Sequence, residues 1–285
     1  MDALETPHAR AMRRMFAAVG DLYATWWHDW FHFALFEGDE PWEEAYRRTH
    51  ARYLADLRAA DARHVLELAC GRGGFAAVLA EHTRGDVLAI DISEAQLARA
   101  RRHRLSNLRF VQHDVMRVHE LGGPYDAVSF MDAACYLPDK ALAIERIARV
   151  MAPGGRLLLI DWCRQEGLNF VQQELVLEPF MRLWAIPSLE TGEGYTRHLS
   201  QHFRILAAED LNHRTRRNWD YGYERALEAV QAATVAKLPP LVWKGMRLGA
   251  EGIRLIKEQF PAALYIKAGF DAGFLRYKYF LCERR

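Results

Sequence analysis

The sequence lacks a surplus of charge of either sign. It has 38 basic and 37 acidic residues, a formal net charge of +1 and an isoelectric point near 7.8. Such a chain has no global electric field that collects polyanions at its surface. The balance of charges therefore argues against nucleic acid as a partner.

Cysteine is scarce too, and apolar runs are short. The four cysteines are far apart, without the paired short spacing of a zinc site or of a secreted disulfide framework, which favours a reducing cytoplasm and predicts no metal site. No stretch approaches the roughly 20 apolar residues that span a bilayer, and the first residues lack an apolar run followed by a cleavage site. We expect a soluble, unprocessed cytoplasmic protein without a membrane span.

What the sequence does have is a large apolar fraction. Hydrophobic residues make up 51% of the 285 residues, which is enough to fill the core of a full-sized domain. There is no internal repeat and no low-complexity linker, so changes in periodicity divide a single globular unit into parts. These parts are a helical N-terminal segment at 1–60, an α/β core at 61–163, a helical cap insertion at 164–200 and a C-terminal part at 201–285.

The core alternates short apolar runs with helical segments. Five runs have the length and composition of buried strands: 64–68, 86–90, 108–111, 125–130 and 156–160. Three helical segments lie between them: 75–82, 93–104 and 139–151. This alternation is typical of a parallel sheet built from βαβ units. Two more strands and two helices are predicted in the last part of the chain: strands 202–208 and 274–281, helices 220–236 and 243–260.

A glycine loop follows the first predicted strand. Gly71 and Gly73 permit a tight turn and a close approach of the backbone to a ligand, directly before a helix. The loop satisfies the loose dinucleotide pattern G-x-G-x-x-[GA], and Asp91 at the end of the next strand suits a ribose hydroxyl. The spacing alone leaves an NAD enzyme and an adenosylmethionine enzyme both open.

Five motifs occur in order and resemble those of the class I S-adenosylmethionine-dependent methyltransferases. They are Glu67-x-Ala-x-Gly71-x-Gly73, Ala89–Ala100, Gln112–Val115, Tyr125–Ser129 and Arg149–Asp161. The resemblance implies a doubly wound, Rossmann-like, mostly parallel seven-strand sheet whose last strand is antiparallel. It also implies S-adenosyl-L-methionine as the methyl donor and S-adenosyl-L-homocysteine as the product. An NAD-dependent oxidoreductase offers no account of Asp114 or of the terminal strand pair.

The resemblance assigns cofactor contacts residue by residue. Glu67 and the backbone of the loop are expected at the amino acid end of the cofactor, and Asp91 at its ribose hydroxyls. Ile92 and Val115 would cover the adenine faces, while Asp114 would accept a hydrogen bond from its amine. The whole predicted set is Glu67, Ala69, Gly71, Gly73, Asp91, Ile92, Gln96, Asp114, Val115 and Met131. The plainer readings are a solvated strand-end charge at Glu67, a turn residue at Asp114 and a helix-capping residue at Asp91.

The stretch Ser129–Asp139 resembles the small-molecule branch of these enzymes, which includes sterol, tocopherol, sugar O-, glycine N- and prenyl diphosphate C-methyltransferases. Many members carry Glu at the position of Asp132 and His at the position of Tyr136. Tyrosine, with an ordinary pKa near 10, is a poor general base, and this weakens the case for O-methylation. Tyr136 is more similar to the branch that methylates alkenes of prenyl diphosphates.

A second element of this branch, H-[FY]-G-L-[FY], resembles His32–Phe36, with Ala34 in place of glycine. Aromatic residues crowd this part of the chain, and aromatic faces stabilise the carbocation formed when an alkene is methylated. Tyr23 and Trp27 are candidates for such contacts. An amphipathic helix that packs its aromatics into a core or a dimer seam is the plainer reading.

Loss of a proton from that carbocation requires a base. The predicted catalytic residues are Tyr136, Glu178 and Asp161; Glu178 is preferred over Glu174, one helical turn earlier, because it precedes an apolar stretch suited to a pocket wall. The plainer interpretation is that Glu174 and Glu178 are solvated charges on a helix and that Asp161 caps the end of a strand. The cluster His213–Arg217 offers cations for a diphosphate, or is simply a solvated turn.

Taken together, the sequence predicts methylation of a small apolar acceptor, with carbon of an isoprenoid or other alkene favoured over oxygen or nitrogen. An O- or N-methyltransferase of a specialised metabolite is the alternative. A further alternative is a cyclase that binds adenosylmethionine without methyl transfer. The expected partner is a small molecule, and assembly into a homo-oligomer is left open.

Overall fold

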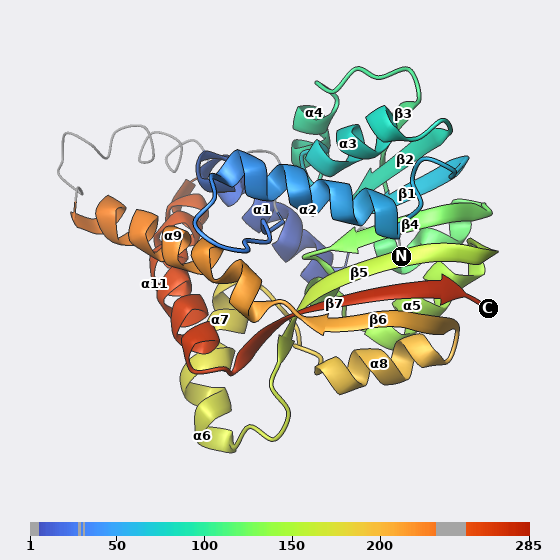
Figure 1. Ribbon diagram of the computed structural model, residues 1–285. Coiled ribbons are helices and arrows are strands. Elements are labelled where there is room, and N and C mark those ends of the chain that lie inside the picture. The colour runs from blue at the N-terminus through green and yellow to red at the C-terminus, as the bar shows by residue number, and fades with distance from the viewer. Residues whose placement is uncertain (1–5, 28–29, 31, 232–248) are drawn as a thin grey trace.

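The computed structural model describes residues 6–27, 30, 32–231 and 249–285 (Figure 1). Its centre is one sheet of seven strands: β1 (His64–Leu68), β2 (Asp86–Asp91), β3 (Leu108–Gln112), β4 (Tyr125–Met131), β5 (Met151–Arg164), β6 (Phe203–Asp210) and β7 (Leu275–Arg284). The strand order is β3-β2-β1-β4-β5-β7-β6. Strands β1 to β5 are parallel, and β7 runs antiparallel to both β5 and β6. The predicted doubly wound sheet with an antiparallel last strand is confirmed.

Helices cover both faces of this sheet. One face carries α2 (Trp42–Asp56), α3 (Gly74–His82) and α4 (Glu94–Ala100), whose apolar side chains share a core with the strands. The other face carries the 3₁₀ helix η2 (Val115–Glu120), α5 (Lys140–Arg149) and α8 (Gly192–Ser200), which enclose a second core. Side chains alternate between the two cores along each strand, as the pleat of a strand requires.

A cap of helices gathers at the end of the sheet toward which β1–β5 run (Figure 1). It consists of α1 (Pro7–Trp27), the short η3 (Ala134–Tyr136), α6 (Phe170–Gln172), the π-helical turn η4 (Gln173–Leu177), α7 (Glu178–Leu183), α9 (Asn212–Gln231) and α11 (Gly249–Asp271). Helix α11 packs on α1, α7 and α9. The cap therefore draws on far more of the chain than the predicted insertion at 164–200.

Two details differ from the predicted elements. Helix α8 lies inside the range predicted for the cap, yet it packs on α5 and β6 beside the sheet. Helix α9 begins at Asn212, earlier than predicted, directly after β6. The predicted helix boundaries near 236 and 243 lie outside the described residues. In the described part of the chain, no helix is both long and apolar enough to cross a bilayer, and no cluster of three metal-binding side chains occurs.

Candidate functional site

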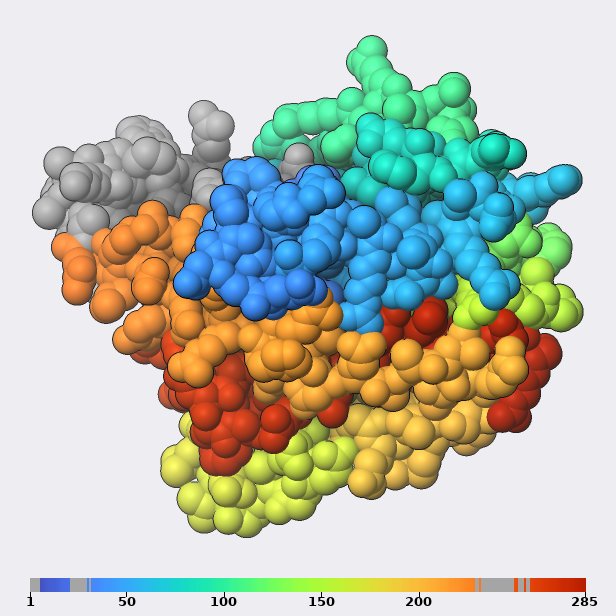
Figure 2. Space-filling model, in the orientation of Figure 1, coloured from blue at the N-terminus to red at the C-terminus, as the bar shows by residue number. Residues whose placement is uncertain are grey.

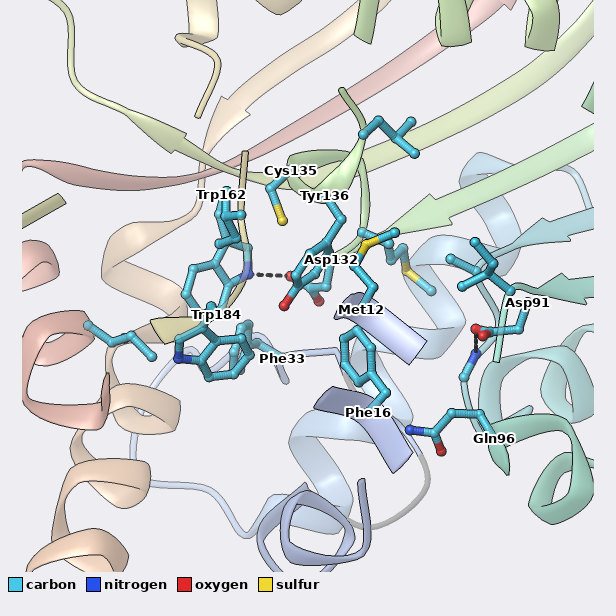
Figure 3. Close-up of a pocket in the computed structure, with 18 of the residues that line it drawn as sticks. Met12, Phe16, Phe33, Asp91, Gln96, Asp132, Cys135, Tyr136, Trp162 and Trp184 are labelled. Carbon is cyan, nitrogen blue, oxygen red and sulfur yellow. Dashed lines mark hydrogen bonds between the residues drawn. The ribbon is translucent and has the colours of Figure 1, made fainter. Parts of the chain in front are cut away.

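An elongated cavity opens where the parallel strands end beneath the cap. It encloses about 1470 Å³ of empty space, counting its open mouth. Figure 3 shows Asp91 and Gln96 at one end of the cavity and Trp162, Trp184 and Phe33 at the other.

The glycine loop shapes the first end of the cavity. Ala69 and Gly71 both adopt positive φ angles, of 52° and 54°, and both line the cavity. Gly73, at φ 77°, is not part of the lining. A Cβ atom at Gly73 would lie 2.7 Å from the ring of Phe110, so this glycine permits close packing of α3 against the sheet.

Asp91 is the best-defined polar group at this end. It ends β2, is buried, and accepts hydrogen bonds from the backbone N–H groups of Gly71 (2.9 Å) and Ser93 (2.7 Å). Burial raises its pKa from 3.8 to about 6, against the lowering effect of these two hydrogen bonds. Ser93, not Asp91, caps α4, since its side chain accepts from the N–H of Gln96. The carboxylate of Asp91 is therefore available to a ligand.

The remaining predicted cofactor residues surround Asp91. Ile92, Gln96, Val115 and Met131 line the cavity together with Asp114, whose carboxylate accepts the backbone N–H of Met116 at 2.8 Å. Burial raises the pKa of Asp114 as well. In all, eight of the ten residues predicted for the cofactor line this cavity: Ala69, Gly71, Asp91, Ile92, Gln96, Asp114, Val115 and Met131.

Glu67 lies behind the glycine loop and is absent from the cavity lining. Its side chain is buried and accepts a hydrogen bond from the backbone of Ala76 in α3. Burial, with a further contribution from the nearby charge of Asp91, raises the pKa of Glu67 well above its ordinary value. One oxygen of Glu67 thus links β1 to α3, while the other, Oε2, is buried without a hydrogen-bond partner among the described residues.

Aromatic side chains build the second end of the cavity. Trp162 on β5, Trp219 on α9, Trp184 after α7 and Phe33 before α2 all line it. The ring centroids of Phe33 and Trp219 are 4.1 Å apart, and those of Trp162 and Trp219 are 5.0 Å apart. These four residues, called the aromatic wall below, converge from distant parts of the chain. Sequence analysis pointed to Phe33, within the element His32–Phe36, and to the apolar stretch after Glu178 that ends at Trp184, but not to Trp162 or Trp219.

Asp132 is the carboxyl group that meets this wall. It follows β4 with a left-handed backbone, φ 54°, and its N–H donates to the carbonyl of Ile160 at 2.9 Å. One carboxyl oxygen accepts from the indole of Trp162 (2.7 Å) and the other from the hydroxyl of Tyr277 (2.8 Å). Burial raises its pKa well above 3.8, although both hydrogen bonds act to lower it. Asp132 was noted in the sequence only as a replacement for Glu.

Tyr136 is the predicted catalytic residue that does line the cavity. The ring of Phe16 on α1 meets it edge-on, with centroids 5.5 Å apart. The ring nitrogen Nε2 of His8, also on α1, donates to the backbone carbonyl of Tyr136 at 2.7 Å. Helix α1 thus closes over the middle of the cavity, where Figure 3 shows Phe16, Met12, Tyr136 and Asp132 between the two ends.

The two predicted carboxylate bases lie outside the cavity lining. Glu178 begins α7 and is exposed, because the buried residues of this turn are Leu177 and Phe180. Asp161 is fully buried on the opposite face of the sheet from Trp162, as the two-residue period of a strand dictates. There it accepts the hydroxyl of Tyr195 at 2.5 Å, and burial raises its pKa to about 6. Glu174 is exposed as well.

The basic cluster His213–Arg217 is engaged at the surface. Arg214 pairs with Glu37 at 3.1 Å, and Arg217 donates to the carbonyls of Gly38 (3.1 Å) and Glu40 (2.8 Å). Figure 2 shows this contact as the blue segment before and within α2 lying on orange α9. None of these residues is among those that line the cavity.

Residues 32–36, which resemble the family element, are fixed to α9 by the buried side chain of Asn218. Its carbonyl oxygen accepts the N–H of Ala34 (3.1 Å), and its amide nitrogen donates to the carbonyls of Ala34 and Thr215 (2.9 Å each). This double contact places Phe33 in the aromatic wall. The side chains of Tyr23 and Trp27, also named from the sequence, lie outside the described set.

Comparison with known proteins matches residues 65–155 to a family described as "Methyltransferase domain". A sterol 24-C-methyltransferase of Aspergillus fumigatus is 28% identical over 73% of this chain and 58% of that protein. A 2-methyl-6-phytyl-1,4-hydroquinone methyltransferase of Synechocystis is 26% identical over 78% of this chain and 68% of that protein. The chain thus spans between about half and two thirds of the length of these curated relatives.

Among solved structures, the fold is similar to that of a mycolic acid cyclopropane synthase complexed with S-adenosylhomocysteine and CTAB. The TM-score is 0.79 and the identity 15%, over 99% of this chain and 100% of that chain. The glycine loop, Asp91, Asp114 and Asp132 lie within the matched residues 65–155. Residues 65–155 match a methyltransferase domain, and over most of its length the chain is similar to the methyltransferases named above.

Proposed function

We propose that this protein transfers a methyl group from S-adenosylmethionine to carbon of an alkene in a small, lipophilic acceptor. The observation that carries the proposal is the juxtaposition of Asp132 with the aromatic wall, in the same cavity as Asp91. The named relatives, which methylate a sterol and a phytyl hydroquinone, support an acceptor of this kind.

The residues at the Asp91 end fit the cofactor chemically. A buried carboxylate with two free lone-pair directions suits the two ribose hydroxyls. Ile92 and Val115 offer apolar faces for an adenine ring, and the carboxylate of Asp114 suits its amine. When bound, S-adenosylmethionine supplies an electrophilic methyl group on a sulfonium centre.

The aromatic wall serves the acceptor. As the alkene attacks the methyl group, a carbon–carbon bond forms, the carbon–sulfur bond breaks and a carbocation remains on the acceptor. Aromatic rings in the lining, such as those of Trp162, Trp184 and Trp219, stabilise a cation without attacking it, and one such contact is worth about 1–2 kcal/mol in a desolvated site. The wall also excludes water, which would otherwise trap the carbocation as an alcohol.

Asp132 completes the reaction as the proton acceptor. Its carboxylate takes a proton from a carbon next to the cationic centre, a new double bond forms, and the proton later passes to solvent. Because burial raises its pKa, the ionised form of Asp132 is a stronger base than a solvated aspartate. Asp132 replaces Glu178 and Asp161 in this role because it is the one of the three that lines the cavity.

Methyl-labelled S-adenosylmethionine and a panel of sterols, prenyl alcohols, prenyl hydroquinones, phenols and amines test the proposal, with mass spectrometry locating the label. We expect label on carbon, and a rate lowered at least a hundredfold in Asp132→Asn. Label on oxygen or nitrogen would contradict alkene methylation and identify the protein as an O- or N-methyltransferase. An acceptor that rearranges without gaining mass would indicate a cyclase.

A further inference from the structure

The carboxyl group of Asp132 accepts hydrogen bonds from two side chains on neighbouring strands. Trp162 on β5 and Tyr277 on β7 are direct partners in the antiparallel register of these strands. Because cross-strand partners point to the same face of a sheet, both side chains rise toward Asp132. Each donates to a different carboxyl oxygen, Trp162 at 2.7 Å and Tyr277 at 2.8 Å.

We propose that Trp162 and Tyr277 are positioning residues that set both the direction and the basicity of Asp132 during methyl transfer. This inference rests on the proposed function, since it takes Asp132 as the proton acceptor. A carboxyl group held at both oxygens cannot rotate without breaking a hydrogen bond. The pair therefore keeps the unused lone pairs of Asp132 on the cavity side, toward the acceptor.

The backbone supports the same arrangement. A left-handed φ at a residue other than glycine costs on the order of 1 kcal/mol or more and persists where neighbouring contacts determine it. At Asp132 those contacts are the N–H bond to Ile160 on β5 and the two side-chain bonds. Strand β5 thus fixes the residue from its backbone, while β5 and β7 together fix its carboxyl group.

The two donors also act on the protonation of Asp132. Both are neutral, and both favour the ionised carboxylate, whereas burial and the nearby charge of Asp161 favour the protonated form. The other titratable groups nearby are Cys135 and the tyrosines Tyr46 and Tyr53 of α2, all of them acids. Loss of either donor therefore moves the pKa of Asp132 upward.

Tyr277→Phe tests this inference, because it removes one donor and keeps the ring. Tyr279→Phe is the matched control: it lies two residues along the same strand, and its hydroxyl bonds to Asp56 at 2.6 Å instead. The titration of Asp132 is followed by ¹³C NMR on protein labelled at aspartate Cγ, with S-adenosylhomocysteine bound. The resonance that is missing in Asp132→Asn identifies the group.

We expect the midpoint of this titration to rise by about one pH unit in Tyr277→Phe and in Trp162→Phe, since a hydrogen bond to a charged group is lost. It should stay in place in Tyr279→Phe. With an active acceptor, the acid limb of the kcat profile of Tyr277→Phe should move to higher pH by the same unit, so that kcat on this limb falls about tenfold, with KM for S-adenosylmethionine unchanged.

An unmoved midpoint in Tyr277→Phe, or an equal shift in Tyr279→Phe, would overturn the inference. Its failure is distinct from that of the proposed function. If Asp132→Asn is inactive while the profile of Tyr277→Phe matches the wild type, Asp132 remains the proton acceptor and the positioning role is wrong. If Asp132→Asn methylates at the wild-type rate, the proton acceptor itself is wrong.

Discussion

Replacing Asp91 with alanine should remove the affinity for the cofactor. In the proposed complex the carboxylate of Asp91 accepts both ribose hydroxyls, and a hydrogen bond to a charged group contributes about 1.5–3 kcal/mol. Loss of two such bonds amounts to about 3–6 kcal/mol, which is roughly two to four orders of magnitude in Kd. Calorimetric titration with S-adenosylhomocysteine measures this change directly.

The same substitution should leave the fold in place. Burial raises the pKa of Asp91 from 3.8 to about 6, so holding it ionised at neutral pH costs the folded protein about 3 kcal/mol. Alanine removes this cost but leaves the N–H groups of Gly71 and Ser93 without their acceptor, at about 1–3 kcal/mol each. The two effects oppose each other, and the thermal midpoint should move by only a few degrees.

The pH dependence of the affinity for S-adenosylhomocysteine provides a second test of Asp91. Because the ionised carboxylate is the form that accepts both hydroxyls, affinity should fall about tenfold for each pH unit below 6 and level off above 7. Asp86→Ala, at the exposed far end of the same strand, is the control and should bind as the wild type does. An unchanged Kd for Asp91→Ala would refute the assignment of the ribose site.

Three more predictions follow from contacts around the cavity. Asn218→Asp should lower the free energy of unfolding by about 2–4 kcal/mol in denaturant titrations, because a carboxylate cannot donate to Ala34; an unchanged value would contradict the double contact. Asp161 has a raised pKa of about 6, so its charge destabilises the fold increasingly as pH rises from 4 to 6; Asp161→Asn should flatten that part of the stability profile, and an identical profile would refute the effect. Arg217→Ala should lower the melting temperature and leave the KM of the acceptor unchanged, since its partners lie at the surface; a raised KM would instead place the cluster in substrate binding.

The grouping of residues at the Asp91 end of the cavity could be predicted from the sequence because their geometry is local. Asp91 is the last residue of β2 and Asp114 lies two residues after β3, and such parallel strands end at one edge of the sheet. The turn at Ala69 and Gly71 belongs to a single short segment. Residue order alone was therefore enough to bring these groups together. Gly73 and Glu67 belong to the same motif but are not among the residues that line the cavity; Gly73 permits the close packing of α3.

The acceptor half depends on contacts that no local pattern reveals. Glu178 was preferred because an apolar stretch follows it, yet the helical phase buries Leu177 and Phe180 and turns Glu178 outward. Strand alternation required Asp161 and Trp162 to point to opposite faces, but which face holds the cavity depends on where α9 and α11 pack. Tyr277, 145 residues after Asp132, could not be paired with it from spacing.

The register of β5 and β7 separates two groups of residues along the sequence. The predicted contacts to the cofactor are complete by Met131, before β5 begins. The carboxyl group of Asp132, by contrast, has both its donors only once β7, the last strand, has been added beside β5. In the proposed function, a substitution at Tyr277 on β7 therefore alters the proton acceptor Asp132 while every residue predicted for the cofactor stays unchanged.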